Sequence, residues 1–257
     1  MGTVRWTGPL ESAALLTALP VPARARTSTR GVLPWAPLVG LVLGGLASGV
    51  AVFGNRLISP FAGAVLGIAV LALLTRGLHL DGLADTADGL GPLRDRERAL
   101  QVMHQGDVGP FGVVTLVLTL LLQVACLAAL LPAHGGWLGL CTAVLASRLA
   151  MARTGLPGTA AAEGSALGRA VVGTVSPAWL AGWWLAGAVL VTGTAVATAQ
   201  PADGLRLLAA AAAGLLAADL LLRRATARLG GVTGDVMGAM GEVAATVVLL
   251  GAAALLG

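Results

Sequence analysis

The sequence predicts an all-α integral membrane protein: one bundle of about seven transmembrane helices, with its N-terminus in the cytoplasm. The first observation is composition, because 57% of the residues are hydrophobic and only 11% are charged. Ordinary soluble domains carry roughly 25% charged residues. A soluble fold of this length must cover itself with polar groups, whereas a lipid-facing surface removes that constraint. The second observation is a series of long apolar runs, and the third is the alternation of arginines between them.

Seven apolar runs approach the length that crosses a membrane, since about 20 helical residues span the ~30 Å hydrocarbon core. Backbone polar groups in lipid must be hydrogen-bonded within their own segment, so each run is expected to be a helix. We place the spans near 33–53, 57–75, 112–131, 136–152, 177–196, 205–222 and 237–257. No soluble linker or clear repeat divides them, which predicts a single membrane domain over 1–257.

The basic residues predict the topology. All of the basic residues are arginine, and the formal net charge of +4 is too modest to indicate a nucleic-acid partner. With the N-terminus inside, only Arg56 and Arg206 fall on the outer side, as the positive-inside rule requires. The inner side receives Arg5, Arg24, Arg26, Arg30, Arg76, Arg94, Arg96, Arg98, Arg148, Arg153, Arg169, Arg223, Arg224 and Arg228.

The first 32 residues imitate a secretory signal peptide, because Arg5 precedes the apolar run 13–21. Glu11 and Pro20 fit a signal peptide poorly, and cleavage would invert the arginine pattern. A short helix lying at the cytoplasmic interface is the better interpretation. The chemistry is then expected in three cytoplasmic stretches, about 76–111, 153–176 and 223–242.

An acidic stripe follows the second span directly. On a helix, Asp81, Asp85 and Asp88 stand at i, i+4 and i+7 and share one face. Like charges at this spacing repel, which favours a bound divalent cation. Mg²⁺ is typically held by one or two carboxylates together with substrate phosphates. The stripe therefore predicts a magnesium site.

Two plainer interpretations stay open beside the magnesium site. The acidic face could be neutralised by the three arginines nearby in the sequence, which are Arg94, Arg96 and Arg98. On position alone, His79 is better explained as a structural hydrogen-bonding residue than as a catalytic base.

A second constellation lies at 228–242. If this stretch is helical, Gly231, Gly234, Gly238 and Gly241 form a strip without side chains, which allows close helix packing or lets a phosphate reach backbone amides. The carboxylates Asp235 and Glu242 lie along its edge, at the membrane border. Ionisable groups there are costly and usually functional. We therefore expect a substrate-binding role.

Arginines complete the predicted site. Arg148 and Arg153 lie at the end of the fourth span, and guanidinium groups beside an acidic metal site suit a pyrophosphate. Asp219 lies four residues before Arg223, where an i, i+4 ion pair is the simplest account.

The residues from His79 to Leu90, HLDGLADTADGL, resemble the signature of the cobalamin synthase family, the adenosylcobinamide-GDP ribazoletransferases. Further similarities follow in order at 16–22, 96–100, 106–112, Ser147-Arg148 and 230–235, so the resemblance covers nearly the whole chain. Two departures stand out. The family often has basic residues where this chain has His104 and Gln105, and an Ala-Arg is missing from the stretch 160–168.

The resemblance implies that the chain joins adenosylcobinamide-GDP to α-ribazole or its phosphate, forming adenosylcobalamin or its phosphate and releasing GMP. It implies Mg²⁺, a multi-pass location in the cytoplasmic (inner) membrane with a cytoplasmic active site, and either a homo-oligomer or association with other cobalamin-pathway enzymes. The expected metal ligands are Asp81, Asp85 and Asp88. The expected catalytic residues are Asp85, Asp235 and His79. The expected substrate-binding residues are Arg148, Gly231, Thr233, Gly234, Asp235 and Glu242.

Two other functions fit the sequence less well. CDP-alcohol phosphotransferases also use aspartates on membrane helices, but their motif continues into Ala-Arg. Here Asp81-Gly82 is followed by Leu83-Ala84-Asp85. A secondary transporter would place its ionisable residues near the bilayer midplane, whereas these carboxylates gather at one membrane face.

Overall fold

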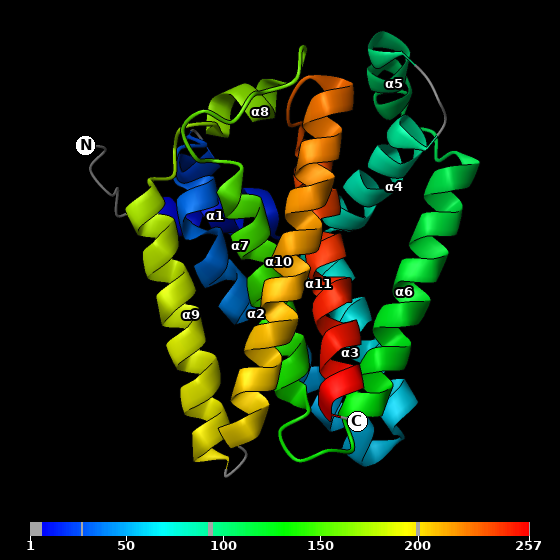
Figure 1. The fold of residues 1–257 in the computed structure, drawn as a ribbon, viewed down its shortest axis with the longest axis vertical. Coiled ribbons are helices and arrows are strands. Elements are labelled where there is room, and N and C mark those ends of the chain that lie inside the picture. Colours follow the sequence, from blue (N-terminus) through cyan, green and yellow to red (C-terminus); the bar gives the residue numbers. More distant parts are fainter. Residues whose placement is uncertain (1–6, 27, 92–94, 199–200, 257) are drawn as a thin grey trace.

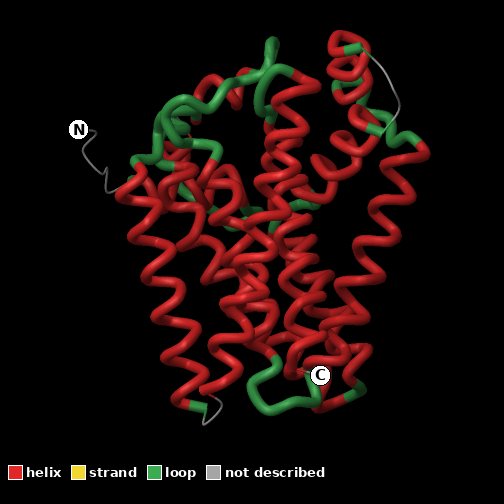
Figure 2. The backbone as a smooth tube through the Cα atoms, in the orientation of Figure 1, coloured by secondary structure: helices red, strands yellow, loops and turns green. Residues whose placement is uncertain are grey.

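The computed structural model describes residues 7–26, 28–91, 95–198 and 201–256. Within these ranges the chain consists of α-helices, one short 3-10 helix at Ala23–Arg26 and connecting loops (Figure 2). The α-helices are α1 Gly8–Leu16, α2 Val32–Leu57, α3 Pro60–Leu74, α4 Leu78–Leu90, α5 Arg96–Met103, α6 Pro110–Leu130, α7 Trp137–Arg153, α8 Ala166–Val171, α9 Pro177–Ala197, α10 Pro201–Leu229 and α11 Gly234–Leu256.

The described helices confirm a helical bundle with several membrane-crossing segments. Five helices, namely α2, α6, α9, α10 and α11, are long and apolar enough to cross a bilayer. α3 and α4 meet the same criterion only as one pair, which is bent by 88°. α7 has 17 residues and is mostly buried inside the bundle. Each predicted span is thus helical near its expected bounds, while the count of seven crossings and the cytoplasmic N-terminus stay predictions.

The outer surface of the bundle is apolar, as a lipid environment requires. Large hydrophobic side chains stand exposed on α2, α3, α6, α9 and α10. Among them are Phe53, Phe61, Val114, Leu118, Leu121, Leu185, Val189, Leu216 and Leu220.

The two ends of the bundle are distinguished by their helices and by the arginines that they carry. α5, α8 and the turn between α10 and α11 lie at one end, and the C-terminus lies at the other (Figure 1). We call the first the α5/α8 end. Arg56 in the last turn of α2 and Arg206 near the start of α10 lie at the opposite end. Arg5 and Arg94 belong to the predicted arginine pattern but lie outside the described residues.

The N-terminal segment contains the short helix that was predicted. α1 packs against α2, and its buried Glu11 accepts the Gly31 backbone N–H at 2.8 Å and the Thr7 hydroxyl at 2.8 Å. The Gly31 amide has no partner within α2, because it lies at the start of that helix. Glu11, which argued against a signal peptide, therefore joins α1 to the first long helix.

A sharp bend aims α4 toward α11. Arg76 (φ 56°) and Gly77 (φ 67°) are both left-handed, a conformation uncommon for a residue other than glycine. The Arg76 guanidinium donates to the Leu15 carbonyl at 3.1 Å, which ties the bend to α1. The chain leaves the direction of α3 here, so α4 crosses the bundle instead of prolonging a span.

Two stretches expected as loops contain more helix than the sequence analysis assumed. Most of 76–111 is α4 and α5, and in 223–242 only residues 230–233 separate α10 from α11. Both α10 and α11 continue past the apolar runs because their polar residues remain compatible with helix. The acidic residues are consequently held on helices that pack against each other.

Candidate active site

Glycines let α4 and α11 cross in close contact. A Cβ atom on Gly82 of α4 would lie 2.7 Å from the Asp235 carbonyl oxygen, and one on Gly238 of α11 would lie 3.1 Å from the His79 Cα. Any side chain at these positions would push the helices apart. The crossing therefore brings Asp85 of α4 close to Asp235 at the start of α11.

Four carboxylates act on one another at this crossing. Asp85 is half-buried, and it lies within electrostatic reach of Asp81, Asp235 and Asp88. Asp81, which is exposed, also acts on Asp235. Carboxylates from two separate stretches of the sequence thus lie within electrostatic reach of one another. Their mutual repulsion favours a cation or a proton between them.

His104 supplies a basic group that the sequence analysis noted only as a departure from the family pattern. It ends α5, and it acts electrostatically on both Asp85 and Asp235. Its Nδ1 lies 2.6 Å from the Leu100 carbonyl oxygen. A hydrogen bond donated from Nδ1 leaves Nε2 as the atom that can meet a ligand.

Asp88 holds a helix in place. Its side chain is 3% exposed, and its two oxygens accept the backbone N–H groups of Gly109 at 2.7 Å and Gly112 at 3.0 Å. Gly109 is the N-cap of α6 and has no side chain to satisfy those amides. Although Asp88 shares the acidic stripe, it turns toward α6, so its predicted role as a metal ligand meets a competing structural one.

The turn between α10 and α11 is hydrogen-bonded to the predicted cytoplasmic stretch 153–176. Val232 donates to the Ala160 carbonyl at 2.9 Å, and the Ala162 amide donates to the Val232 carbonyl at 3.1 Å. A Cβ on Gly231 would collide with this backbone. The glycine serves the close approach of two loops, and the altered stretch 160–168 directly supports the turn before Asp235.

Thr233 and the remaining glycines have packing roles as well. The Thr233 hydroxyl accepts the Val236 amide at 3.1 Å, which caps α11, and lies 3.3 Å from the Asp235 carboxylate. Gly234 faces the Leu167 side chain, and Gly241 faces the Ser147 hydroxyl. Helix packing thus accounts for this part of the glycine strip, while Thr233 orients Asp235.

His79, Arg148 and Glu242 come together below the carboxylate cluster, inside the bundle. With Gln123 they line a small cavity of about 40 Å³, which has room for a water molecule. His79 is 2% and Arg148 3% exposed, and the His79 Nε2 has no hydrogen-bond partner among the described residues. These three predicted site residues are therefore neighbours, and His79 and Arg148 are more deeply buried than Asp85 and Asp235.

Gln123 is a partner that the sequence analysis missed. Its amide donates to Glu242 at 2.9 Å and to the Thr246 hydroxyl at 3.0 Å, which joins α6 to α11. The signal was available, because Gln123 is an amide in an otherwise apolar run. Arg148 donates to the Ser147 hydroxyl at 3.0 Å and feels the charge of Glu242.

The carboxylates at the crossing suit a cation that substrate completes. Within the described ranges, no three His, Cys, Asp or Glu side chains converge as a closed metal site. Asp81, Asp85 and Asp235 offer oxygen atoms only, the donor type that Mg²⁺ prefers. Mg²⁺ commonly takes one or two carboxylates, waters and substrate phosphates. The donor set fits that arrangement better than an all-protein cage.

Comparisons with known proteins show the family of the chain. The model of the family described as cobalamin-5-phosphate synthase matches residues 9–253. An adenosylcobinamide-GDP ribazoletransferase of Frankia casuarinae is 39% identical over 92% of this chain and 90% of the relative. Proteins of the same name from Nocardioides (39% identical, 93% and 95% covered) and Chlorobaculum tepidum (37%, 93% and 91%) are also similar. No solved structure matches the chain. Because both the family model and these relatives cover nearly its full length, the chain belongs to the cobalamin-5-phosphate synthase family.

Proposed function

We infer that this chain is an adenosylcobinamide-GDP ribazoletransferase, the enzyme that assembles the nucleotide loop of cobalamin. The relatives that carry this name span almost the whole chain. The observation that carries the inference is the crossing of α4 and α11, where Asp85 and Asp235 approach each other. The same relatives favour this function over a CDP-alcohol phosphotransferase or a transporter.

The reaction replaces a phosphoanhydride bond of the diphosphate by a phosphodiester bond. A hydroxyl of α-ribazole, or of its phosphate, attacks the phosphorus attached to cobinamide and forms a new P–O bond. The bond from that phosphorus to the bridging oxygen of the diphosphate breaks, and GMP departs with the bonding electron pair. The proton of the attacking hydroxyl passes to a base on the protein. Such reactions are accelerated mainly by positioning and by neutralising charge.

We propose that one carboxylate, either Asp85 or Asp235, accepts this proton. Each is partly buried, and each stands among other carboxylates, so accepting a proton relieves repulsion. The Thr233 hydroxyl fixes the orientation of Asp235. His104, with Nε2 free, faces both carboxylates and is placed to hold a phosphate oxygen of the substrate.

We propose that one or two of the carboxylates Asp81, Asp85 and Asp235 would hold Mg²⁺ together with the substrate's phosphates, with Asp88 fixing the geometry of α6 beside them. When bound, Mg²⁺ supplies charge neutralisation for the diphosphate and for the departing GMP. Without it, four carboxylates would repel a substrate that carries the same sign of charge. The chain's own contribution is to hold these oxygens on α4 and α11, which Gly82 and Gly238 allow to pack in close contact.

We further propose that the carboxylate cluster faces the cytoplasm, in the inner membrane. Arg30, Arg153 and Arg223 lie at the α5/α8 end of the bundle, which also carries the cluster, whereas Arg56 and Arg206 lie at the opposite end. Cytoplasmic loops carry the excess of arginine in membrane proteins.

Replacement of Asp85 by Asn tests the function. We expect kcat for GMP release from adenosylcobinamide-GDP to fall by about 10²–10⁴-fold, the range for a lost general base. Asp203→Asn is the matched control, because Asp203 pairs with Arg206 at the opposite end of the bundle. Turnover by Asp85→Asn at the rate of the control would refute the role of Asp85, and absence of Mg²⁺-dependent GMP release by the wild-type chain would refute the function.

A further inference from the structure

A second cavity lies away from the carboxylate cluster, between α7, α9 and α10. Its volume is about 410 Å³, and its walls are almost entirely apolar. Leu145 and Leu149 of α7, Trp184 of α9, and Leu215 and Leu216 of α10 form much of the lining. Trp184 and Leu216 are also exposed on the outer surface of the bundle. The cavity is therefore a groove that opens sideways, toward lipid.

The groove is as long as one leaflet of a bilayer. Its lining runs from Thr142 to Arg153 on α7 and from Leu208 to Asp219 on α10. At ~1.5 Å per residue each stretch rises about 16 Å. Half of the ~30 Å hydrocarbon core is about 15 Å. A groove of this length, apolar along its course, matches an extended acyl chain.

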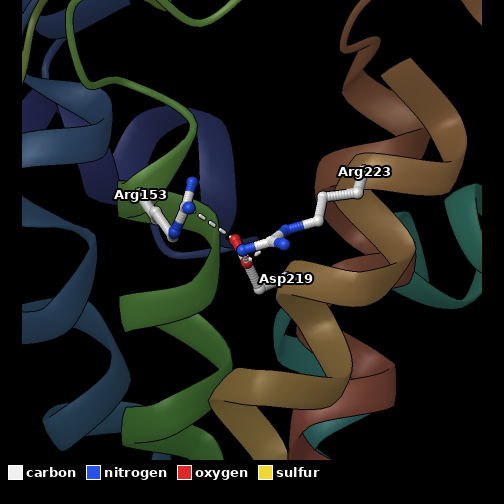
Figure 3. Close-up of polar contacts among 3 residues, drawn as sticks. All are labelled: Arg153, Asp219 and Arg223. Carbon is white, nitrogen blue, oxygen red and sulfur yellow. Dashed lines mark hydrogen bonds and ion pairs between the residues drawn. The ribbon is translucent and has the colours of Figure 1, made fainter. Parts of the chain in front are cut away.

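Charged groups close only one end of the groove. Asp219 accepts Arg153 from α7 on one carboxylate oxygen and Arg223 at 2.9 Å on the other (Figure 3). Two guanidinium groups meet one carboxylate, so the cluster carries a net positive charge. Because the rest of the groove is apolar, the charge marks the end where a headgroup would lie.

Both arginines keep donors for a further anion. Arg153 uses one terminal nitrogen for Asp219, and its other nitrogens have no partner among the described residues. Its side chain is 35% exposed and that of Arg223 is 74% exposed. The fork of a guanidinium matches the oxygens of a phosphate. A phosphodiester can therefore bind here without displacing Asp219.

We propose that this groove binds one anionic phospholipid, with an acyl chain lying between α7, α9 and α10 and its phosphate on Arg153 and Arg223. A zwitterionic lipid brings its own cation, which the net positive mouth disfavours. An anionic lipid complements that charge. The site is separate from the α4–α11 crossing, because α7 and α10 form its walls on another face of the bundle (Figure 1).

The headgroup half of the proposal is tested on the purified full-length chain in detergent, by native mass spectrometry and by thermal unfolding. We expect phosphatidylglycerol to bind and raise the unfolding midpoint more than phosphatidylcholine of the same acyl chains. Arg153→Gln and Arg223→Gln should each weaken phosphatidylglycerol binding by about tenfold, the effect of losing a charge-assisted hydrogen bond. Arg224→Gln, which removes the same charge one residue further along α10, is the matched control and should bind as the wild type does.

A separate variant tests whether an acyl chain occupies the groove. Ala212→Trp fills the groove from α10 and leaves both arginines in place, whereas Ala213→Trp changes the next exposed residue, outside the lining. We expect only Ala212→Trp to lose phosphatidylglycerol binding. The proposal is overturned if both tryptophan variants bind equally, if phosphatidylcholine binds as tightly as phosphatidylglycerol, or if inorganic phosphate alone reproduces the stabilisation.

Discussion

At the residue scale, two aspartates on one helical stripe have different surroundings. Asp85 faces Asp235 across the α4–α11 crossing, while Asp88, three residues later, caps α6 through Gly109 and Gly112. The spacing that suggested one common role cannot distinguish them. The difference arises because α6 starts with a glycine and needs an acceptor from elsewhere.

Replacing Asp88 by Ala removes both hydrogen bonds to α6. We expect a loss of about 1–2 kcal/mol in the free energy of unfolding, the cost of losing an N-terminal helix cap. The Mg²⁺ concentration for half-maximal activity of the folded fraction should stay unchanged. Thermal unfolding and a Mg²⁺ titration measure these two quantities. A raised Mg²⁺ requirement at wild-type stability would instead identify Asp88 as a metal ligand.

Glu242→Leu tests the polar residues below the carboxylate cluster. The substitution leaves Arg148 buried without the carboxylate whose charge it feels, and removes an acceptor of Gln123. We expect a loss of about 1–3 kcal/mol, the cost of leaving buried polar groups without a partner. The double variant Arg148→Met, Glu242→Leu should recover part of it. A raised KM with unchanged unfolding would return Glu242 to the substrate-binding role predicted from sequence.

At the element scale, the bend after α3 and the glycines of the crossing place the carboxylates. Arg76 and Gly77 turn the chain by 88°. Gly82 then allows α4 to lie against the backbone of α11 at Asp235. Neither element contributes a reacting group, yet both set the separation of Asp85 and Asp235.

Gly82→Ala should therefore impair catalysis while the bundle remains folded. The new Cβ would meet backbone atoms of Asp235 at 2.7–2.8 Å, so α4 must shift, at a typical cost of about 1–3 kcal/mol. We expect kcat of the folded protein to fall by more than the lowered midpoint of thermal unfolding can account for. Gly45→Ala on α2 is the control, since nothing lies within 4 Å of a Cβ there. Equal kcat for both variants would argue against the crossing as the site.

At the scale of the whole molecule, the arginine distribution predicts which end faces the cytoplasm. Single cysteines at Gln105, near α5, and at His134, between α6 and α7, mark opposite ends of the bundle. In a background without Cys126 and Cys141, an impermeant maleimide should label the His134→Cys variant on intact cells. The Gln105→Cys variant should require permeabilised cells. The reverse pattern would place the N-terminus and the carboxylates outside.

The sequence by itself determined the membrane class, the helical runs and the family, and it indicated the acidic residues on which the proposed site rests. Each of these follows from local information: hydrophobicity over about 20 residues, helical spacing, or a contiguous motif. The sequence also indicated two uses of the glycine strip, close helix packing and access of a phosphate to backbone amides, without deciding between them.

Only the tertiary structure decided which groups lie beside each charged residue. Asp235 lies within electrostatic reach of Asp85, Asp88 binds α6, and Arg148 and Glu242 line one cavity, because helices far apart in sequence cross at particular depths and angles. The partner of each polar group depends on which helix lies opposite, and that is set by packing of the whole bundle. Residue spacing along one chain segment carries no information about it.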